Sequence, residues 1–195
     1  MERTLYLIRH GDTEGTLRGL FYGSTDLPLD DSAYPTIEKK RTAGDYPERG
    51  DRLVFTSGML RTEQTLEAIY GTTEHEIIRD LREIELGIFE MKTAKEVMQD
   101  PYGKAWLTGE AEGMNFPGGD RTETFTERVG RGLAVLRHRL EASDVIAVLH
   151  GGVIFTIMMM LFPGEKENAW EWTPEPAGGY RVLFRDGEPT EYTRI

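Results

Sequence analysis

Short apolar runs alternate along the chain with segments in which apolar residues recur every three or four positions. The runs Leu5–Ile8, Leu53–Thr56 and Val145–Leu149 are bounded by charged residues and glycine, a pattern that is typical of buried strands. A shorter stretch, Glu76–Arg79, predicts one more strand. Because predicted strands and helices alternate, the pattern indicates an α/β fold with a mainly parallel central sheet.

The clearest helix is predicted near the middle of the second half, over Glu123–Ala142. Five apolar residues form one stripe along it, namely Phe125, Val129, Leu133, Leu136 and Leu140. Further helices are expected over Ile37–Ala43, Arg61–Tyr70 and Val153–Leu161, and from a Thr93 cap to Gln99. Towards the end, Asp186-Gly187 predicts a hairpin between Tyr180–Phe184 and Glu191–Arg194, with Pro189 restricting the second strand to an edge.

The length of the chain, 195 residues, fits a single domain that spans residues 1–195. Two segments stand apart from the regular pattern. Thr16–Leu29 is rich in glycine and threonine and is predicted to be a loop. Met91–Gly119 contains several glycines and prolines and is predicted to be an excursion with one or two short helices. Excursions of this size beside a pocket often act as lids or specificity regions.

Charge and composition exclude several classes of partner. A formal net charge of −11 argues against nucleic acid and against attraction to an anionic membrane. An anionic substrate must therefore be bound by a local cluster of Arg and His side chains. The chain has no cysteine, which excludes disulfides and thiolate chemistry, and its N-terminus lacks a signal-peptide pattern, so we expect a cytoplasmic protein. The apolar stretch 145–162 is interrupted by His150-Gly151-Gly152, which favours strand, turn and helix over a membrane span.

Candidate chemistry follows directly after three of the predicted strands. Arg9-His10-Gly11 follows the first strand, Ser57 and Arg61 follow the second, and His150-Gly151 follows the last. The carboxyl ends of parallel strands meet at one edge, where ligands bind in open α/β sheets. Arginine suits phosphate and histidine can act as a nucleophile. By itself, however, Arg-His-Gly is equally typical of a surface arginine beside a hydrogen-bonded histidine.

Taken together, the motifs resemble those of the histidine phosphatase superfamily, in particular its small bacterial phosphatases such as alpha-ribazole phosphatase. The resemblance rests, in chain order, on Arg9-His10-Gly11-Asp12-Thr13, Ser57–Thr65, Leu81–Gly87, Pro117-Gly118-Gly119 and His150-Gly151. It implies a three-layer phosphoglycerate mutase-like fold, in which helices flank a mainly parallel central sheet.

The resemblance also implies a role for each matched residue. His10 is expected to become phosphorylated, and Arg9 and Arg61 to bind the phosphate together with a protonated His150. Glu83 is the expected proton donor, with Glu85 as the competing carboxylate. Further contacts to phosphate or substrate are expected from Thr13, Thr16, Tyr22, Gly23 and Gly151.

The expected reaction is hydrolysis of the phosphate monoester of a small metabolite, without a metal or another cofactor. The long insertion of the glycolytic mutases is absent from Met91–Gly119, which favours a phosphatase over a phosphoglycerate mutase. A phosphomutase and a non-catalytic module that binds a phosphorylated ligand are the alternatives. Gly15 and Thr16 replace the aromatic residue and asparagine of many members, so the motifs do not identify the substrate, and the sequence assigns no oligomeric state.

Overall fold

A six-stranded sheet forms the centre of the protein in the computed structural model, which describes residues 1–110 and 115–195. The strand order is β4-β3-β6-β1-β7-β8. The first four strands are parallel and the last two form an antiparallel hairpin at one edge. Their bounds are Glu76–Ile77 (β4), Leu53–Thr56 (β3), Val145–Leu149 (β6), Glu2–Arg9 (β1), Gly179–Arg185 (β7) and Glu188–Arg194 (β8). The mainly parallel sheet of the predicted α/β class is therefore confirmed.

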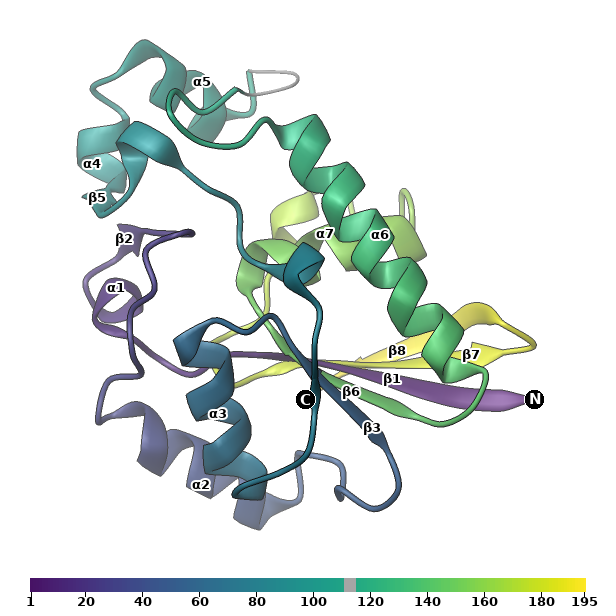
Figure 1. Cartoon of the computed structure of the whole chain (residues 1–195). Helices are drawn as coiled ribbons and strands as arrows, with labels where there is room; N and C mark the ends of the chain where they lie inside the picture. Colours follow the sequence, from purple (N-terminus) through teal and green to yellow (C-terminus); the bar gives the residue numbers. More distant parts are fainter. Residues whose placement is uncertain (111–114) are drawn as a thin grey trace.

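Helices cover both faces of this sheet. In Figure 1, α2 (Ala33–Ala43) and α3 (Leu60–Tyr70) lie on one side, and α6 (Thr122–Leu140) and α7 (Gly151–Leu161) lie on the other. The alternation of side chains along a strand explains the two layers. Leu5 and Leu7 of β1 belong to the cluster beneath α6 and α7, whereas Ile8 belongs to the cluster beneath α2 and α3.

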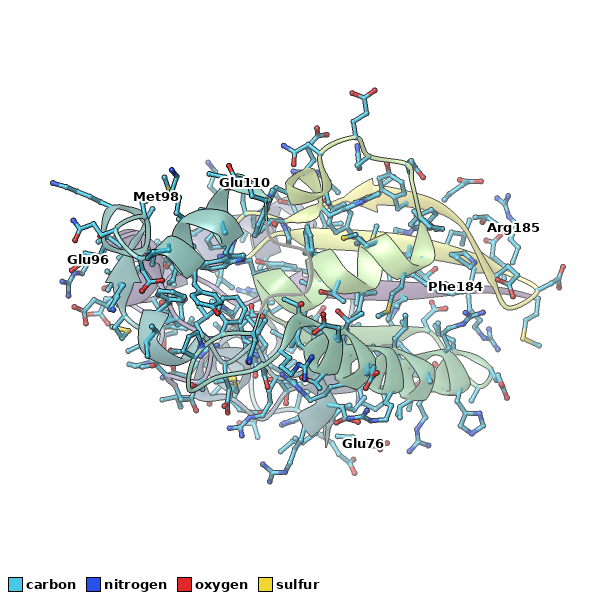
Figure 2. The ribbon with its side chains drawn as sticks, turned by 90° about the horizontal axis from the view of Figure 1, so that it is seen from above. Glu76, Glu96, Met98, Glu110, Phe184 and Arg185 are labelled. Atoms are coloured by element: carbon cyan, nitrogen blue, oxygen red, sulfur yellow. The ribbon has the colours of Figure 1, made fainter. Side chains whose placement is uncertain are left out.

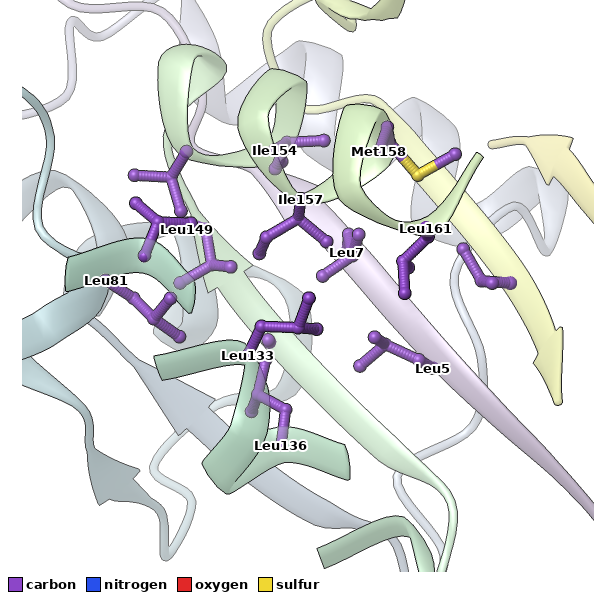
Figure 3. Close-up of a cluster of buried hydrophobic side chains, with 14 of the residues drawn as sticks. Leu5, Leu7, Leu81, Leu133, Leu136, Leu149, Ile154, Ile157, Met158 and Leu161 are labelled. Carbon is purple, nitrogen blue, oxygen red and sulfur yellow. The ribbon is translucent and has the colours of Figure 1, made fainter. Parts of the chain in front are cut away.

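The larger cluster fixes α7 against the sheet. Figure 3 shows Leu133 and Leu136 of α6 beside Leu5 and Leu7 of β1, with Ile157 of α7 above them. Each of these side chains is at most 6% exposed, so the two helices and the strand share one dry core. The start of α7, which directly follows β6, is thereby held at the carboxyl edge of the sheet.

The segments before and after α3 carry small elements that the sequence pattern did not predict. The expected loop Thr16–Leu29 contains the end of α1 (Glu14–Leu17) and a two-residue strand, β2 (Leu20–Phe21), which pairs with β5 (Lys92–Thr93). The strand predicted over Glu76–Arg79 is shorter, because a 3₁₀ turn, η1 (Arg79–Leu81), follows it.

The excursion contains two short helices, as expected, and part of a separate aromatic core. Thr93 caps α4 (Ala94–Val97), and Asp100 caps α5 (Pro101–Thr108), whose proline occupies the first helical position. Another 3₁₀ turn, η2 (Gly87–Phe89), precedes them. Residues 111–114 of the excursion lie outside the described residues. Phe89, Val97 and Phe116 form the core, with Trp106 packed against them.

The hairpin at the other end of the chain matches its prediction. Asp186 and Gly187 form the turn with positive φ angles of 53° and 85°, the backbone that a tight two-residue turn requires. β8, which contains Pro189, is the edge strand. The last 3₁₀ turn, η3 (Ala169–Trp172), lies between α7 and β7. In the described part of the chain, no helix is long and apolar enough to cross a bilayer.

Candidate active site

The carboxyl ends of β1, β3 and β6 lie side by side at one edge of the sheet. The register pairs Arg9 with Leu149 and Thr56 with Val148. The residues that follow these strands are therefore neighbours in space, although they lie far apart in the sequence. His10 and His150 illustrate this, because their ring centroids are 5.4 Å apart.

His10 is held in the protonation state of a nucleophile. It is 3% exposed, and its Nδ1 lies 2.7 Å from the carbonyl oxygen of Gly11. Because a carbonyl can only accept, Nδ1 carries the proton and Nε2 keeps its lone pair. Burial, followed by the positive charges of Arg61 and Arg9, holds the pKa of His10 well below its usual value of 6.5. The ring is therefore neutral.

Burial and nearby arginines also keep the ring of His150 neutral in this structure, whereas the sequence motifs led us to expect a protonated ring beside a bound phosphate. Its Nδ1 accepts a hydrogen bond of 3.2 Å from Nε of Arg61, and its Nε2 donates to the hydroxyl of Ser57 at 2.7 Å. Burial comes first among the causes that lower its pKa well below 6.5, followed by the positive charges of nearby arginines, of which Arg61 acts most strongly. A bound phosphate dianion would oppose those positive charges and favour the protonated ring.

Arg61 is completely buried and its guanidinium is fixed on every side. Besides His150, it donates to the carbonyl oxygens of Gly23 at 2.9 Å and Thr25 at 3.1 Å. The ring of Tyr22 lies 5.1 Å from its Cζ atom, a cation–π distance. The cation is thus positioned before any substrate binds.

The loop that holds Arg61 is held in turn by Glu90. The carboxylate of Glu90 accepts hydrogen bonds from the backbone N–H groups of Gly23, Ser24, Thr25 and Leu86, and from the hydroxyl of Thr25 at 2.6 Å. Burial acts to raise the pKa of Glu90, but the hydrogen bonds outweigh it and the pKa lies below the usual value. Glu90 therefore stabilises the loop conformation in its ionised form.

Arg9 is hydrogen-bonded to the segment that precedes β7. Its Nη1 donates to the carbonyl oxygen of Pro174 at 2.7 Å. Its Nε is buried and has no hydrogen-bond partner among residues 1–110 and 115–195. A buried N–H without a partner is costly, so an anionic ligand here would satisfy a donor that the protein leaves unpaired.

Glu83 lies at the N-terminus of α7. Its Oε2 accepts from the N–H of Gly152 at 2.9 Å and its Oε1 from the N–H of Ile84 at 3.0 Å. A Cβ atom at position 152 would lie 2.5 Å from Oε1 of Glu83, so a side chain at this position would displace the carboxylate. Glu85 is exposed, and its backbone N–H donates to the carboxylate of Asp120. Its side chain is absent from the lining of the cavity that Glu83 lines. Of the two carboxylates, the geometry favours Glu83.

A cavity of about 1030 Å³ lies over these groups, between the excursion, α7 and the segment around Pro176. Seven of the predicted site residues line it: Arg9, His10, Thr16, Tyr22, Arg61, Glu83 and Gly151. Although Thr16 reaches the cavity, its hydroxyl is already bonded to the backbone of Thr13 in the cap of α1. The cavity has the size of a small-molecule site.

The other three predicted site residues, Thr13, Gly23 and His150, do not line the cavity themselves. Thr13 is fully buried and donates its hydroxyl to the hydroxyl of Tyr22 at 2.7 Å. Gly23 contributes its carbonyl to Arg61, and His150 is joined to the same arginine. These residues position Tyr22 and Arg61.

Comparison with known proteins identifies the family. Residues 5–193 match the model of the histidine phosphatase superfamily, branch 1. The chain belongs to this superfamily. Among curated relatives, "Probable phosphoglycerate mutase GpmB" of Salmonella paratyphi C (strain RKS4594) is 27% identical over 154 residues, which make up 75% of this chain and 69% of the relative.

Solved structures of other proteins share the fold along almost the whole chain. The protein TTHB049 of Thermus thermophilus aligns with a TM-score of 0.74 and 27% identity over 98% of both chains. A phosphoglycerate mutase of the same organism gives 0.74 and 28% over 100% of this chain and 99% of the other. An Escherichia coli K-12 protein, provisionally named an alpha-ribazole-5'-P phosphatase, gives 0.81 at 23% identity over 96% and 93%. The phosphoglycerate mutase-like fold is thereby shown.

Proposed function

We propose that this protein hydrolyses phosphate monoesters through a phosphohistidine at His10. The observation that carries the proposal is the free Nε2 of a neutral, buried His10 at a cavity that Arg9 and Arg61 also line. A neutral imidazole is a competent nucleophile, and two fixed guanidinium groups offset the charge that makes a phosphate dianion resist attack.

In the first step, Nε2 of His10 attacks phosphorus and a P–N bond forms while the P–O bond to the alcohol breaks. The departing oxygen takes the electron pair and receives a proton from Glu83. Charge-assisted hydrogen bonds from Arg9 and Arg61 stabilise the phosphoryl oxygens. Because these cations supply the electrostatic stabilisation, we expect the reaction to proceed without an added metal ion.

In the second step, water attacks the phosphohistidine. A P–O bond to water forms, the P–N bond breaks, its electron pair returns to Nε2 of His10, and Glu83 takes the proton of the water. Inorganic phosphate is then released. The cycle restores His10 to its starting state, so the histidine is a catalyst and not a reactant.

A phosphomutase is the second candidate, because relatives of this chain are named phosphoglycerate mutases. The two reactions share the phosphohistidine and differ in its acceptor, which is water in one case and a substrate hydroxyl in the other. Product analysis with 3-phosphoglycerate and a bisphosphate primer separates them. Release of phosphate supports the hydrolase, whereas isomerisation without release supports the mutase.

Rapid quench with a ³²P-labelled alkyl phosphate tests the intermediate itself. In the presence of a chelator we expect label on the protein that survives alkali and is lost in acid, as a phosphohistidine requires. His10→Ala removes the label, while His138→Ala, a change at a side chain that is 75% exposed, retains it. Label that persists in His10→Ala contradicts the proposal.

A further inference from the structure

The part of the cavity beside His10, its floor, is charged, whereas the remaining sides, its walls, are mostly apolar. The charged groups Arg9, Arg61 and Glu83 gather near His10, whereas much of the remaining lining is aromatic or aliphatic. The aromatic part comes from three regions of the fold, namely β2 with the excursion, α6, and α7 with the turn η3. Its members are Phe21, Trp106, Phe116, Phe125, Phe155 and Trp170.

These rings form two preorganised surfaces. Trp106 stands between Phe21, at 4.9 Å between ring centroids, and Phe116, at 5.0 Å. In the second surface, Phe155 packs against Trp170 at 5.3 Å. Trp170 is nevertheless 55% exposed. An exposed tryptophan that lines a cavity offers its apolar area to a ligand.

The charges that line the cavity exclude a second anionic group on the substrate. Among the lining residues in the described part of the chain, Arg9 and Arg61 are the basic ones, and both are committed to the phosphate. The acidic residues Asp12, Glu83 and Glu175 line it as well. A substrate carboxylate or second phosphate would therefore lie against apolar rings or like charges, and burial of an unpaired charge is unfavourable.

We propose that the physiological substrate is the phosphate monoester of an apolar, uncharged alkyl or aryl alcohol. This inference rests on the proposed function, since it takes His10, Arg9 and Arg61 as the place of the phosphate. The phosphate lies on the charged floor and the organic group lies against the two aromatic surfaces. Phosphoglycerates, with their carboxylate, and bisphosphates fall outside the substrate class.

A series of n-alkyl phosphates, from ethyl to octyl, tests the apolar walls. The leaving alcohols in this series have nearly the same acidity, so differences in kcat/KM report on binding of the chain and not on leaving-group chemistry. We expect kcat/KM to rise about two- to fourfold per methylene until the cavity is filled, as for burial of a methylene. A flat or falling series overturns the inference. Failure to hydrolyse any ester, including activated aryl phosphates, overturns the proposed function instead.

A matched pair of substrates tests the charge argument. Glycerol 3-phosphate and 3-phosphoglycerate have the same three-carbon skeleton and differ in an alcohol against a carboxylate. We expect kcat/KM for 3-phosphoglycerate to be about tenfold lower than for glycerol 3-phosphate. This ratio corresponds to a free-energy cost of a little over 1 kcal/mol for the unpaired carboxylate. Equal values, or a preference for 3-phosphoglycerate, overturn the inference while leaving phosphohistidine chemistry intact.

Variants of the wall connect the substrate preference to named side chains. Phe155→Ala and Met159→Ala both shorten side chains that line the cavity, and we expect each to lower kcat/KM for octyl phosphate about three- to tenfold more than for ethyl phosphate. Met98→Ala is the control, because Met98 and Met159 are both 42% exposed. Met98 lies at the outer edge of the molecule (Figure 2). If Phe155→Ala does not fold, Met159→Ala decides, and an unchanged octyl-to-ethyl ratio overturns the inference.

Discussion

Glu90→Gln tests how the proposed phosphate site is supported, because the change keeps the shape of the side chain and removes its charge. Glu90 lies outside the cavity lining, so a direct contact with substrate is not at issue. Its carboxylate holds the loop Gly23–Thr25, and the carbonyls of Gly23 and Thr25 hold Arg61. The substitution therefore reaches the phosphate through the loop and the arginine.

The expected loss in free energy of unfolding follows from the individual hydrogen bonds of Glu90. The glutamine keeps one oxygen, but its amide nitrogen replaces Oε2, which accepts from the N–H and the hydroxyl of Thr25 at 3.2 and 2.6 Å. The N–H of Thr25 then faces another donor, and the remaining bonds lose their charge assistance. With about 1–3 kcal/mol for an unsatisfied group and about 1 kcal/mol for the weakened bonds, we expect the free energy of unfolding to fall by roughly 2–4 kcal/mol.

The loss depends on pH with a definite sign. The folded protein holds the pKa of Glu90 below the usual value, so the carboxylate contributes stability above the pKa of the unfolded chain and loses it as the pH falls through the folded value. The difference in unfolding free energy between the wild type and Glu90→Gln is therefore largest at neutral pH. We expect it to shrink below pH 4.5, the usual value for glutamate.

Two measurements on the same variant separate support of Arg61 from general stability. Urea unfolding gives the change in free energy, and competitive inhibition by inorganic phosphate gives the change in anion affinity, for which we expect a loss of about tenfold. Glu96→Gln is the matched control. Glu96 accepts from the N–H and hydroxyl of Thr93 in the same way, but it lies at the outer edge of the molecule (Figure 2).

The outcome that refutes the reasoning is specific. If Glu90→Gln lowers the unfolding free energy as calculated but binds phosphate within twofold of the wild type, Glu90 stabilises the loop without positioning Arg61. If the unfolding free energy does not change, the loop does not depend on the carboxylate, and the hydrogen-bond argument itself is wrong.

Three further predictions concern the catalytic groups. Arg61→Ala should weaken competitive inhibition by phosphate and vanadate about 100-fold, by loss of charge-assisted hydrogen bonds; wild-type affinity would place Arg61 outside the phosphate site. Glu83→Gln should slow single-turnover cleavage of alkyl phosphates by about 10²–10⁴-fold. It should slow cleavage of nitrophenyl phosphate less, because nitrophenolate leaves without a proton. If Glu85→Gln shows this pattern instead, Glu85 and not Glu83 is the proton donor. Since burial and the arginines lower the pKa of His10, its ring resonances in NMR spectra of the unliganded protein should not titrate near pH 6.5, and a midpoint at or above that value contradicts the assignment of a neutral ring.

The sequence pattern predicted the layers because they depend on side chains that burial selects. Val145, Ala147 and Leu149 face one layer of helices, and Ile146 and Val148 face the other, so β6 shows as an uninterrupted apolar run. The same reasoning located His10 and His150 at one edge, because a polar residue directly after a buried strand has few other places to lie.

The parts that were missed depend on the backbone or on small energy differences. Every residue has a carbonyl group, so nothing in the sequence marks those of Gly23, Thr25 and Pro174 as partners of the two arginines. No sequence motif marks Glu90, because its partners are backbone N–H groups whose positions depend on the conformation of the loop. The lowered pKa of His150 could not be predicted from the sequence either, since the desolvation that lowers it comes from packing that only the folded structure shows.

The topology also places the assembly of the active site late in folding. His10, the proposed nucleophile, directly follows β1. Its N–H donates to the carbonyl oxygen of Leu149 and its own carbonyl accepts from the N–H of Ala177, while the N–H of Arg9 donates to the carbonyl oxygen of Gly178. These contacts join the two ends of the sequence, and closure of so long a loop slows folding. During synthesis, β1 and His10 leave the ribosome long before their partners exist. The backbone contacts of His10 therefore form only after the segment before β7 has emerged.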